Sequence, residues 1–155
     1  MSVVRKAGRA TLHRWHGLLN LPHYTQKAWY QARYNEELAE FRQARTRLEK
    51  LSEESDVFFA LSRANYDGFP VGELPVFEAR HILVYVYMIS KYTSRWAFFR
   101  VLALLCRAPH PTAVREVVNA SKDAKLFGVA LRHQIDPERF TTIGRRLRVV
   151  WPLLP

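Results

Sequence analysis

The residues best suited to metal binding or proton transfer are histidines and glutamates near the start of the chain. His13 and His16 are three residues apart and would share one face of a helix. A zinc site needs at least one further ligand, and this basic segment offers none. Glu36, Glu37 and Glu40 crowd together as in a solvated helix start, and acid–base catalysis would also need a pocket around them. We therefore expect no metal, no cofactor and no catalytic residue.

Other catalytic patterns are also missing from the sequence. It contains no nucleophile elbow, no phosphate-binding glycine loop and no zinc-protease helix, and its six glycines are scattered. Cys106 is the single cysteine, which excludes an internal disulfide and suits a small buried position. These observations favour a binding protein over an enzyme that acts on a small-molecule substrate.

Positive charge is the chemical feature that remains. The 155 residues include 24 Lys and Arg but 14 Asp and Glu, which gives a net charge of +10. Residues 1–35 hold six basic groups and no acid, residues 36–78 hold five basic and ten acidic groups, and residues 107–155 hold nine basic and four acidic groups. This balance favours an anionic partner such as nucleic acid or an anionic membrane surface.

The predicted contacts to that partner lie in the two basic ends of the chain. They are Arg5, Lys6, Arg9 and Arg14 near the N-terminus, and Arg139, Arg145, Arg146 and Arg148 near the C-terminus. If phosphate contacts dominate, affinity should fall steeply as the salt concentration rises.

Residues 1–22 resemble a targeting segment. A basic, acid-free and partly amphipathic start is typical of mitochondrial import sequences, and we expect a helix over residues 3–19 that ends before Pro22. Two outcomes stay open: cleavage after import, or retention of the segment on a membrane surface. The predicted location is the mitochondrial matrix or the matrix side of the inner membrane.

The rest of the chain predicts helices and no sheet. Hydrophobic residues make up 48% of the sequence, enough for a folded core. We expect an all-α protein with one helical domain over residues 23–155: a long amphipathic helix over 25–66, a linker over 67–75, an apolar helix over 76–107 in a hairpin-like arrangement, and a pair of short basic helices within 112–155.

The apolar helix over residues 76–107 has three interpretations. It could be buried in protein, lie at a membrane surface or span a membrane. Lys91 and Arg95 interrupt its apolar runs, and basic groups at the centre of a span cost about 2.5–3.5 kcal/mol each, which disfavours the span. The side chains predicted to face a membrane or a partner are Ile82, Val86, Ile89, Trp96 and Phe99.

The C-terminal helices predict a helix-turn-helix. Asp136 and Pro137 form a strong helix start. In a DNA-reading helix, polar residues including Arg139, Thr141, Thr142 and Arg145 would point outward, while Phe140 and Ile143 pack inward. Gln134 and Asp136 occupy a turn that commonly contains glycine. Phosphate contacts to RNA without base reading are the other interpretation.

Several runs of the sequence resemble one protein family over half to two thirds of the chain. The runs are LPHYT (21–25), ARYNEE (32–37), SDVFF (55–59), SRANYDG (62–68) and RVVWPLL (148–154). They resemble the fungal mitochondrial family of MIOREX complex component 7. The resemblance implies a mitochondrial location and association with the organelle's ribosome and gene-expression assemblies, and it brings no active site. A calmodulin-binding label used for some members does not transfer, because no IQ-type run is present.

The function predicted from the sequence is a non-enzymatic mitochondrial factor that associates with the mitochondrial ribosome or its membrane-bound neighbours, with rRNA phosphates as candidate contacts. Two alternatives remain. One is an accessory or assembly subunit of an inner-membrane complex, and the other is a helix-turn-helix protein that binds nucleic acid.

Overall fold

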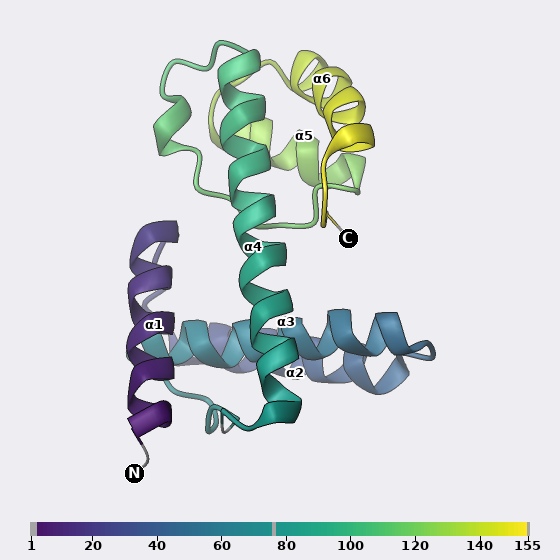
Figure 1. The fold of residues 1–155 in the computed structure, drawn as a ribbon. Coiled ribbons are helices and arrows are strands. Elements are labelled where there is room, and N and C mark those ends of the chain that lie inside the picture. Colours follow the sequence, from purple (N-terminus) through teal and green to yellow (C-terminus); the bar gives the residue numbers. More distant parts are fainter. Residues whose placement is uncertain (1–2, 76, 155) are drawn as a thin grey trace. The chain divides into compact units, whose positions relative to one another are not determined.

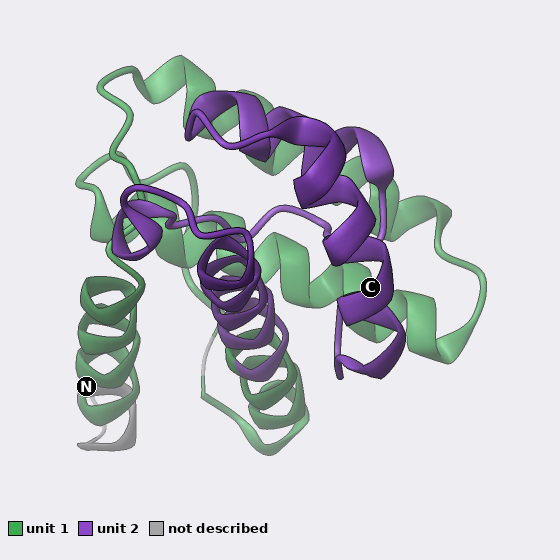
Figure 2. Cartoon of the chain, turned by 90° about the horizontal axis from the view of Figure 1, so that it is seen from above, with its two compact units in different colours: residues 1–89 green, residues 90–155 purple. Residues whose placement is uncertain are grey.

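The computed structural model describes residues 3–75 and 77–154, with the side chains of residues 3–6 left out. Within these residues the predicted all-α class is confirmed, since only helices, turns and loops occur (Figure 1). The elements are α1 (Val3–Leu19), α2 (Lys27–Gln43), α3 (Arg47–Tyr66), α4 (Ala79–Leu105), the 3-10 turn η1 (Pro111–Ala113), α5 (Asp123–Arg132) and α6 (Pro137–Val150). They form two compact units, residues 1–89 and 90–155 (Figure 2).

The long helix predicted over residues 25–66 is wrong, because two helices, α2 and α3, occupy this stretch. The chain is extended at Ala44 and Thr46. The Thr46 side chain accepts from the Glu49 N–H at 3.1 Å, and the Glu49 carboxylate accepts from the Thr46 N–H at 3.0 Å. This reciprocal capping box satisfies two free amides, which makes a new helix start more favourable than a continued helix.

The sequence predicts one helical domain over residues 23–155, and the structure divides the chain into two compact units near residue 89. The first 22 residues, predicted as a separate segment, belong to the first unit. Leu12, Trp15 and Leu19 of α1 are buried there. Gly8 lies against Phe77 so closely that an added Cβ would come within 2.5 Å of the ring. The apolar side of α1 is therefore used inside the fold.

A buried ion-pair network fixes the loop between α1 and α2 onto α3. Arg63 donates through Nε to Asp67 at 2.6 Å and through Nη2 to the carbonyls of Leu21 and Pro22 at 3.0 and 3.1 Å. Tyr30 donates its hydroxyl to the same carboxylate at 2.7 Å. Burial and this hydrogen bond raise the pKa of Tyr30 to about 12. The loop is thus held by charge-assisted contacts, which are stronger than neutral hydrogen bonds.

The second unit is built around a three-helix core. Its buried side chains come from α4, α5, α6 and the connecting loops: Phe98, Phe99, Leu102, Ala103, Cys106, Val114, Ala120, Leu126, Val129, Ala130, Ile135, Phe140 and Leu154. Gly144 lets α6 approach closely, since a Cβ there would lie 2.9 Å from Leu126 and 3.1 Å from Leu102. Close packing of these buried side chains favours one arrangement of the three helices.

The predicted helix-turn-helix is present as α5, the turn 133–136 and α6 (Figure 1). Gln134 adopts a left-handed conformation with φ +55°, the position where a turn of this kind often has glycine. Asp136 caps α6 as predicted, because its Oδ1 accepts from the N–H groups of Glu138 and Arg139 at 2.9 and 3.0 Å. Phe140 is fully buried and Ile143 packs against the core, also as predicted.

Two of the four Lys and Arg residues of α4 are buried. Lys91 and Arg95 are buried, whereas Arg80 is exposed. Arg95 donates to the carbonyls of Leu154 at 3.0 Å and Val117 at 3.5 Å, so it ties the C-terminal segment to α4. Among the described residues, no helix combines the length and the hydropathy that crossing a membrane requires.

Candidate functional site

The outward face of α6 is the strongest candidate for a binding surface. Arg139, Thr142, Arg145 and Arg146 are exposed, and they fall within one arc of the helix at 100° per residue. In the described part of the chain, Arg139 and Arg146 have no ion pair. Thr141, predicted to point outward, instead has a buried hydroxyl. We call Arg139, Thr142, Arg145 and Arg146 the α6 face.

Asp123 at the start of α5 holds two of the predicted arginines. Arg145 donates to its Oδ2 at 2.6 Å and Arg148 to its Oδ1 at 2.8 Å. These bonds, that of Arg145 foremost, lower the pKa of the Asp123 carboxyl and keep it ionised. Because Asp123 neutralises part of their charge, Arg145 and Arg148 offer less to an external anion than Arg139 and Arg146 do.

The unit that carries the α6 face also carries most of the net positive charge. Residues 90–155 hold 12 basic and four acidic groups, a net charge of +8, whereas residues 1–89 hold 12 basic and ten acidic groups, a net charge of +2. Lys122 and Lys125 beside Asp123 are exposed as well. A local excess of this size attracts polyanions over a distance of about one Debye length.

Exposed apolar side chains accompany these cations. Phe127 and Leu131 of α5, and Val149 and Val150 of α6, are all exposed. The surface of this unit therefore offers contact area as well as charge.

The N-terminal residues predicted to bind an anion lie in the other unit. Arg9 and Arg14 are exposed on α1. Arg5 and Lys6 belong to the same helix, but their side chains lie outside the described residues. The eight predicted residues thus form one group on α6 and one on α1, in different units.

The predicted membrane- or partner-facing stripe of α4 is divided. Ile82 and Val86 are exposed and Ile89 is half-buried. Phe99 is fully buried in the core of the second unit, so its prediction as a surface residue is wrong. Helical periodicity placed these residues on one stripe, but α5 and α6 cover the later part of α4.

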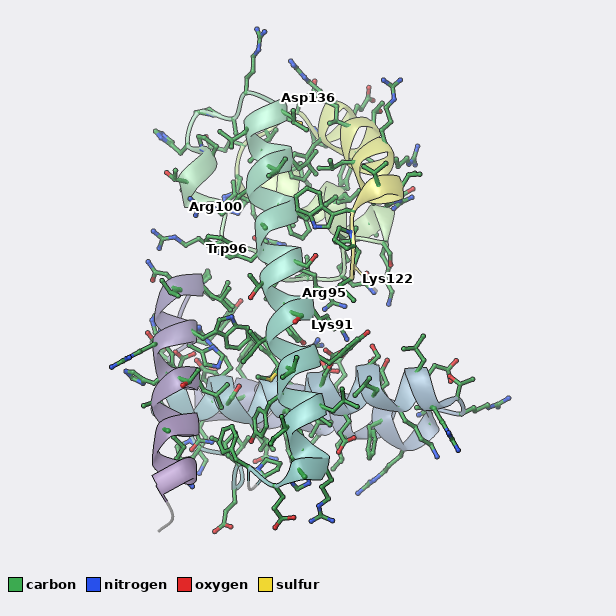
Figure 3. All side chains as sticks on the ribbon, in the orientation of Figure 1. Lys91, Arg95, Trp96, Arg100, Lys122 and Asp136 are labelled. Atoms are coloured by element: carbon green, nitrogen blue, oxygen red, sulfur yellow. The ribbon has the colours of Figure 1, made fainter. Side chains whose placement is uncertain are left out.

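Trp96, also part of that stripe, lies under a cation. The Arg100 guanidinium carbon is 4.5 Å from the centre of the Trp96 ring, and its Nη1 donates to the Thr112 carbonyl at 3.2 Å. Both side chains extend from the same side of α4 (Figure 3). This cation–π pair fixes the orientation of Arg100.

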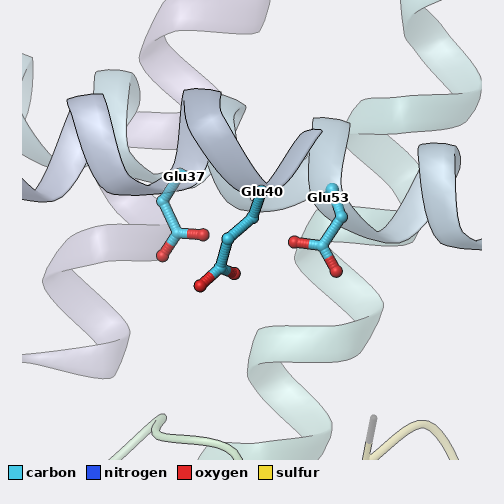
Figure 4. Close-up of side chains that lie close together, drawn as sticks. All are labelled: Glu37, Glu40 and Glu53. Carbon is cyan, nitrogen blue, oxygen red and sulfur yellow. The ribbon is translucent and has the colours of Figure 1, made fainter. Parts of the chain in front are cut away.

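Three carboxylates meet between α2 and α3. One oxygen from each of Glu37, Glu40 and Glu53 lies within 4.8 Å of the others (Figure 4). The sequence brought Glu37 and Glu40 together, but it missed Glu53 because one continuous helix, and not the pair α2 and α3, was expected over residues 25–66. Burial raises the pKa of Glu37 to about 7, although Arg33 beside it acts in the opposite direction. Oxygen ligands at this spacing suit a divalent cation, and protonation of Glu37 also relieves the repulsion.

A serine and a histidine contact each other inside the first unit. His16 Nε2 lies 2.9 Å from Ser62 Oγ, and both residues are buried. The Ser62 hydroxyl donates to the Phe59 carbonyl at 3.1 Å, so the imidazole must donate to Oγ. Burial lowers the pKa of His16 to about 3, with smaller contributions from Arg63 and His13. A serine that accepts from the histidine is not activated as a nucleophile, and this pair is structural.

Comparison with known proteins finds no relative of this chain. No family model, no curated protein and no solved structure matches the chain. The resemblance to MIOREX complex component 7 therefore stays a prediction.

Proposed function

We propose that this protein is a non-enzymatic helical adaptor whose second unit binds the phosphates of an RNA-containing assembly, the mitochondrial ribosome in the first instance. The observation that supports it most is the concentration of charge, a net +8 within residues 90–155. The α6 face presents Arg139 and Arg146, which no carboxylate neutralises within the described residues. Phosphate contacts from such residues supply most of the affinity for RNA and need no base-specific code.

The mitochondrial part of the proposal rests on the sequence. The first 35 residues contain no acid, and the runs described above resemble a mitochondrial family. Because α1 packs into the first unit, we propose that the N-terminal segment is retained in the functional protein. Its detection in intact protein from purified mitochondria, by mass spectrometry of N-terminal peptides, tests this part.

The turn before α6 supports a second candidate function, binding of duplex DNA. The left-handed Gln134 and the capped start of α6 match the geometry of a helix-turn-helix. Arg139 and Thr142 would then lie toward base edges. Competition between duplexes decides between the two functions: phosphate binding predicts that DNA duplexes of equal length displace the RNA alike whatever their sequence, whereas DNA reading predicts stronger displacement by a preferred sequence.

Ribosome co-sedimentation over a series of salt concentrations tests the main proposal. The wild-type protein should pellet with mitochondrial ribosomes at low salt and be released as salt rises. The variant Arg139→Glu/Arg146→Glu should fail to pellet, while the charge-preserving Arg139→Lys/Arg146→Lys should behave much like the wild type. Pelleting that does not change with salt concentration, or that persists in the glutamate variant, would contradict the proposal and favour a protein or membrane partner.

A further inference from the structure

An exposed pair of stacked aromatic rings lies in the first unit, at the start of α2. The ring centres of Tyr24 and Trp29 are 3.8 Å apart and the rings are within 16° of parallel. Tyr24 is 46% exposed and Trp29 is 40% exposed. We call these two rings the aromatic platform. Large rings that leave this much surface in water are candidates for ligand contact.

The aromatic platform is held in place from below. The backbone of Tyr24 is fixed by Tyr30, whose hydroxyl accepts from the Tyr24 N–H at 3.2 Å and lies 3.1 Å from the Tyr24 carbonyl oxygen. The Tyr30 ring stands edge-on to Trp29, with ring centres 5.0 Å apart. Tyr30 is itself anchored to Asp67 and so to Arg63. Little ordering entropy is lost when a ligand binds to rings that are already fixed.

Tyr24 is the more exposed ring of the platform, at 46% against 40% for Trp29. Trp29 is covered by Tyr24 on one face and contacted by Tyr30, whereas Trp29 is the one ring that stacks on Tyr24 among the described residues. A flat ligand on the outer face of Tyr24 would extend the stack to three layers. Two parallel rings offer a plane and not the walls of a cage, so they suit a planar π-system better than a quaternary ammonium group.

The charge around the platform suits a ligand that is also anionic. Residues 1–35 contain no acid, and Lys27 is exposed between the two rings in sequence. The carboxylate joined to the platform through Tyr30, that of Asp67, is 1% exposed and already bound by Arg63, Tyr30 and His23. A nucleotide combines a planar base with a negative phosphate.

We infer that the aromatic platform is a stacking site for a nucleobase of single-stranded RNA, with the exposed Lys27, two residues before Trp29 in the sequence, as the candidate contact for the adjoining phosphate. This inference rests on the proposed RNA-binding function and adds a base contact to it. Base stacking on aromatic side chains tolerates every base, so the site is expected to prefer bases over bare backbone without reading a sequence.

The test compares two probes on the full-length protein. One is a single-stranded RNA of ten uridines, and the other is an abasic ribose-phosphate oligomer of the same length and charge. Binding is followed by fluorescence anisotropy of the labelled probe and by quenching of Trp29, with Trp29→Phe as the baseline for the other tryptophans. Tyr24→Phe keeps the ring, and Tyr24→Leu keeps apolar bulk without it. Circular dichroism verifies that each variant is folded.

We expect the wild type and Tyr24→Phe to bind uridine RNA about tenfold more tightly than the abasic oligomer, and Tyr24→Leu to lose that preference. Should Tyr24→Leu fail to fold, Trp29→Leu must show the same loss. Equal affinity of the wild type for both probes would overturn the stacking site but leave salt-dependent phosphate binding intact. A preference that survives in Tyr24→Leu would also overturn it. Failure to bind either probe would overturn the proposed function as well.

Discussion

The two units of the chain use their charges in different ways. In residues 1–89 acids and bases nearly balance, and several pairs are buried or partly buried, with Asp67 and Glu37 as examples. In residues 90–155 bases exceed acids by eight, and three of the four acids are occupied by arginines or by the cap of α6. The first unit therefore uses charge to fix its own fold, whereas the second has an excess of basic groups that its own acids do not neutralise.

The largest expected effect is the loss of stability in the first unit when Arg63 is removed. Arg63→Ala leaves Asp67 buried without its main partner and frees the loop at residues 21–22. Loss of one partner of a buried pair costs about 3–5 kcal/mol. We expect chemical denaturation to show a loss of this order for the first unit. The double variant Arg63→Met/Asp67→Asn should recover much of it, and the absence of recovery would show that the pair is not the cause.

His16 should make the first unit sensitive to acid. Its pKa is about 3 in the fold against 6.5 in the unfolded chain, so only the unfolded state takes up a proton between these values. Its contribution to stability is present above pH 6.5 and is lost as the pH falls, by up to about 1.4 kcal/mol per pH unit. His16→Gln keeps a donor for Ser62 and does not titrate. The stability of the wild type relative to this variant should fall between pH 6.5 and 3, and a constant difference would contradict the assignment.

The titration of Glu37 should change stability in the opposite direction from that of His16, so that stability falls as the pH rises. Its folded pKa of about 7 exceeds the unfolded value of 4.5, so the fold retains a proton that the unfolded chain releases. The stability from this group is present below pH 4.5 and is lost as the pH rises through 7. Glu37→Gln should therefore gain stability relative to the wild type between pH 4.5 and 7 and keep the gain at pH 8. If millimolar Mg²⁺ or Ca²⁺ stabilises the wild type but not this variant, the three carboxylates bind the cation.

A smaller effect is expected from a substitution at Asp123 in the second unit. Asp123→Asn removes the carboxylate that holds Arg145 and Arg148. The freed guanidinium groups should raise the affinity for single-stranded RNA by a few-fold at low salt, since each added phosphate contact steepens the salt dependence. Anisotropy titration measures this, with Glu138→Gln as a control that removes an exposed acid of the same unit. An equal gain in both variants would mean that the affinity for RNA depends on the net charge of the unit and not on the release of Arg145 and Arg148.

Local signals in the sequence were sufficient for some features. Periodicity predicted an all-α fold, the Asp136-Pro137 pair predicted the start of α6, and Phe140 was correctly placed inside. The turn after Tyr66 was also expected from the residues that follow it. Each of these depends on contacts within a few residues, which is why sequence alone could reveal them.

Other features depend on competition between local sequence signals, or on contacts between residues that are far apart in the sequence. The capping box of Thr46 and Glu49 lies within a stretch of continuous helical periodicity, so periodicity alone predicts one helix where two occur. The carboxylate of Asp67 is joined to Tyr30, 37 residues earlier, and no local pattern indicates this. Glu53 was missed for the same reason, because it joins Glu37 and Glu40 across the turn between α2 and α3. The uneven division of the acids, ten in residues 1–89 and four in residues 90–155, follows only once the division near residue 89 is known.

The most direct test of the account is the salt dependence of RNA binding by three purified full-length proteins. They are the wild type, Arg139→Glu/Arg146→Glu on α6 and Arg9→Glu/Arg14→Glu on α1, and both variants change the net charge equally. We predict that the α6 variant alone loses about tenfold or more in affinity and that the slope of log K against log salt becomes shallower by about one to two. Equal losses in both variants, or no loss in the α6 variant, would contradict the claim that the second unit binds the anionic partner.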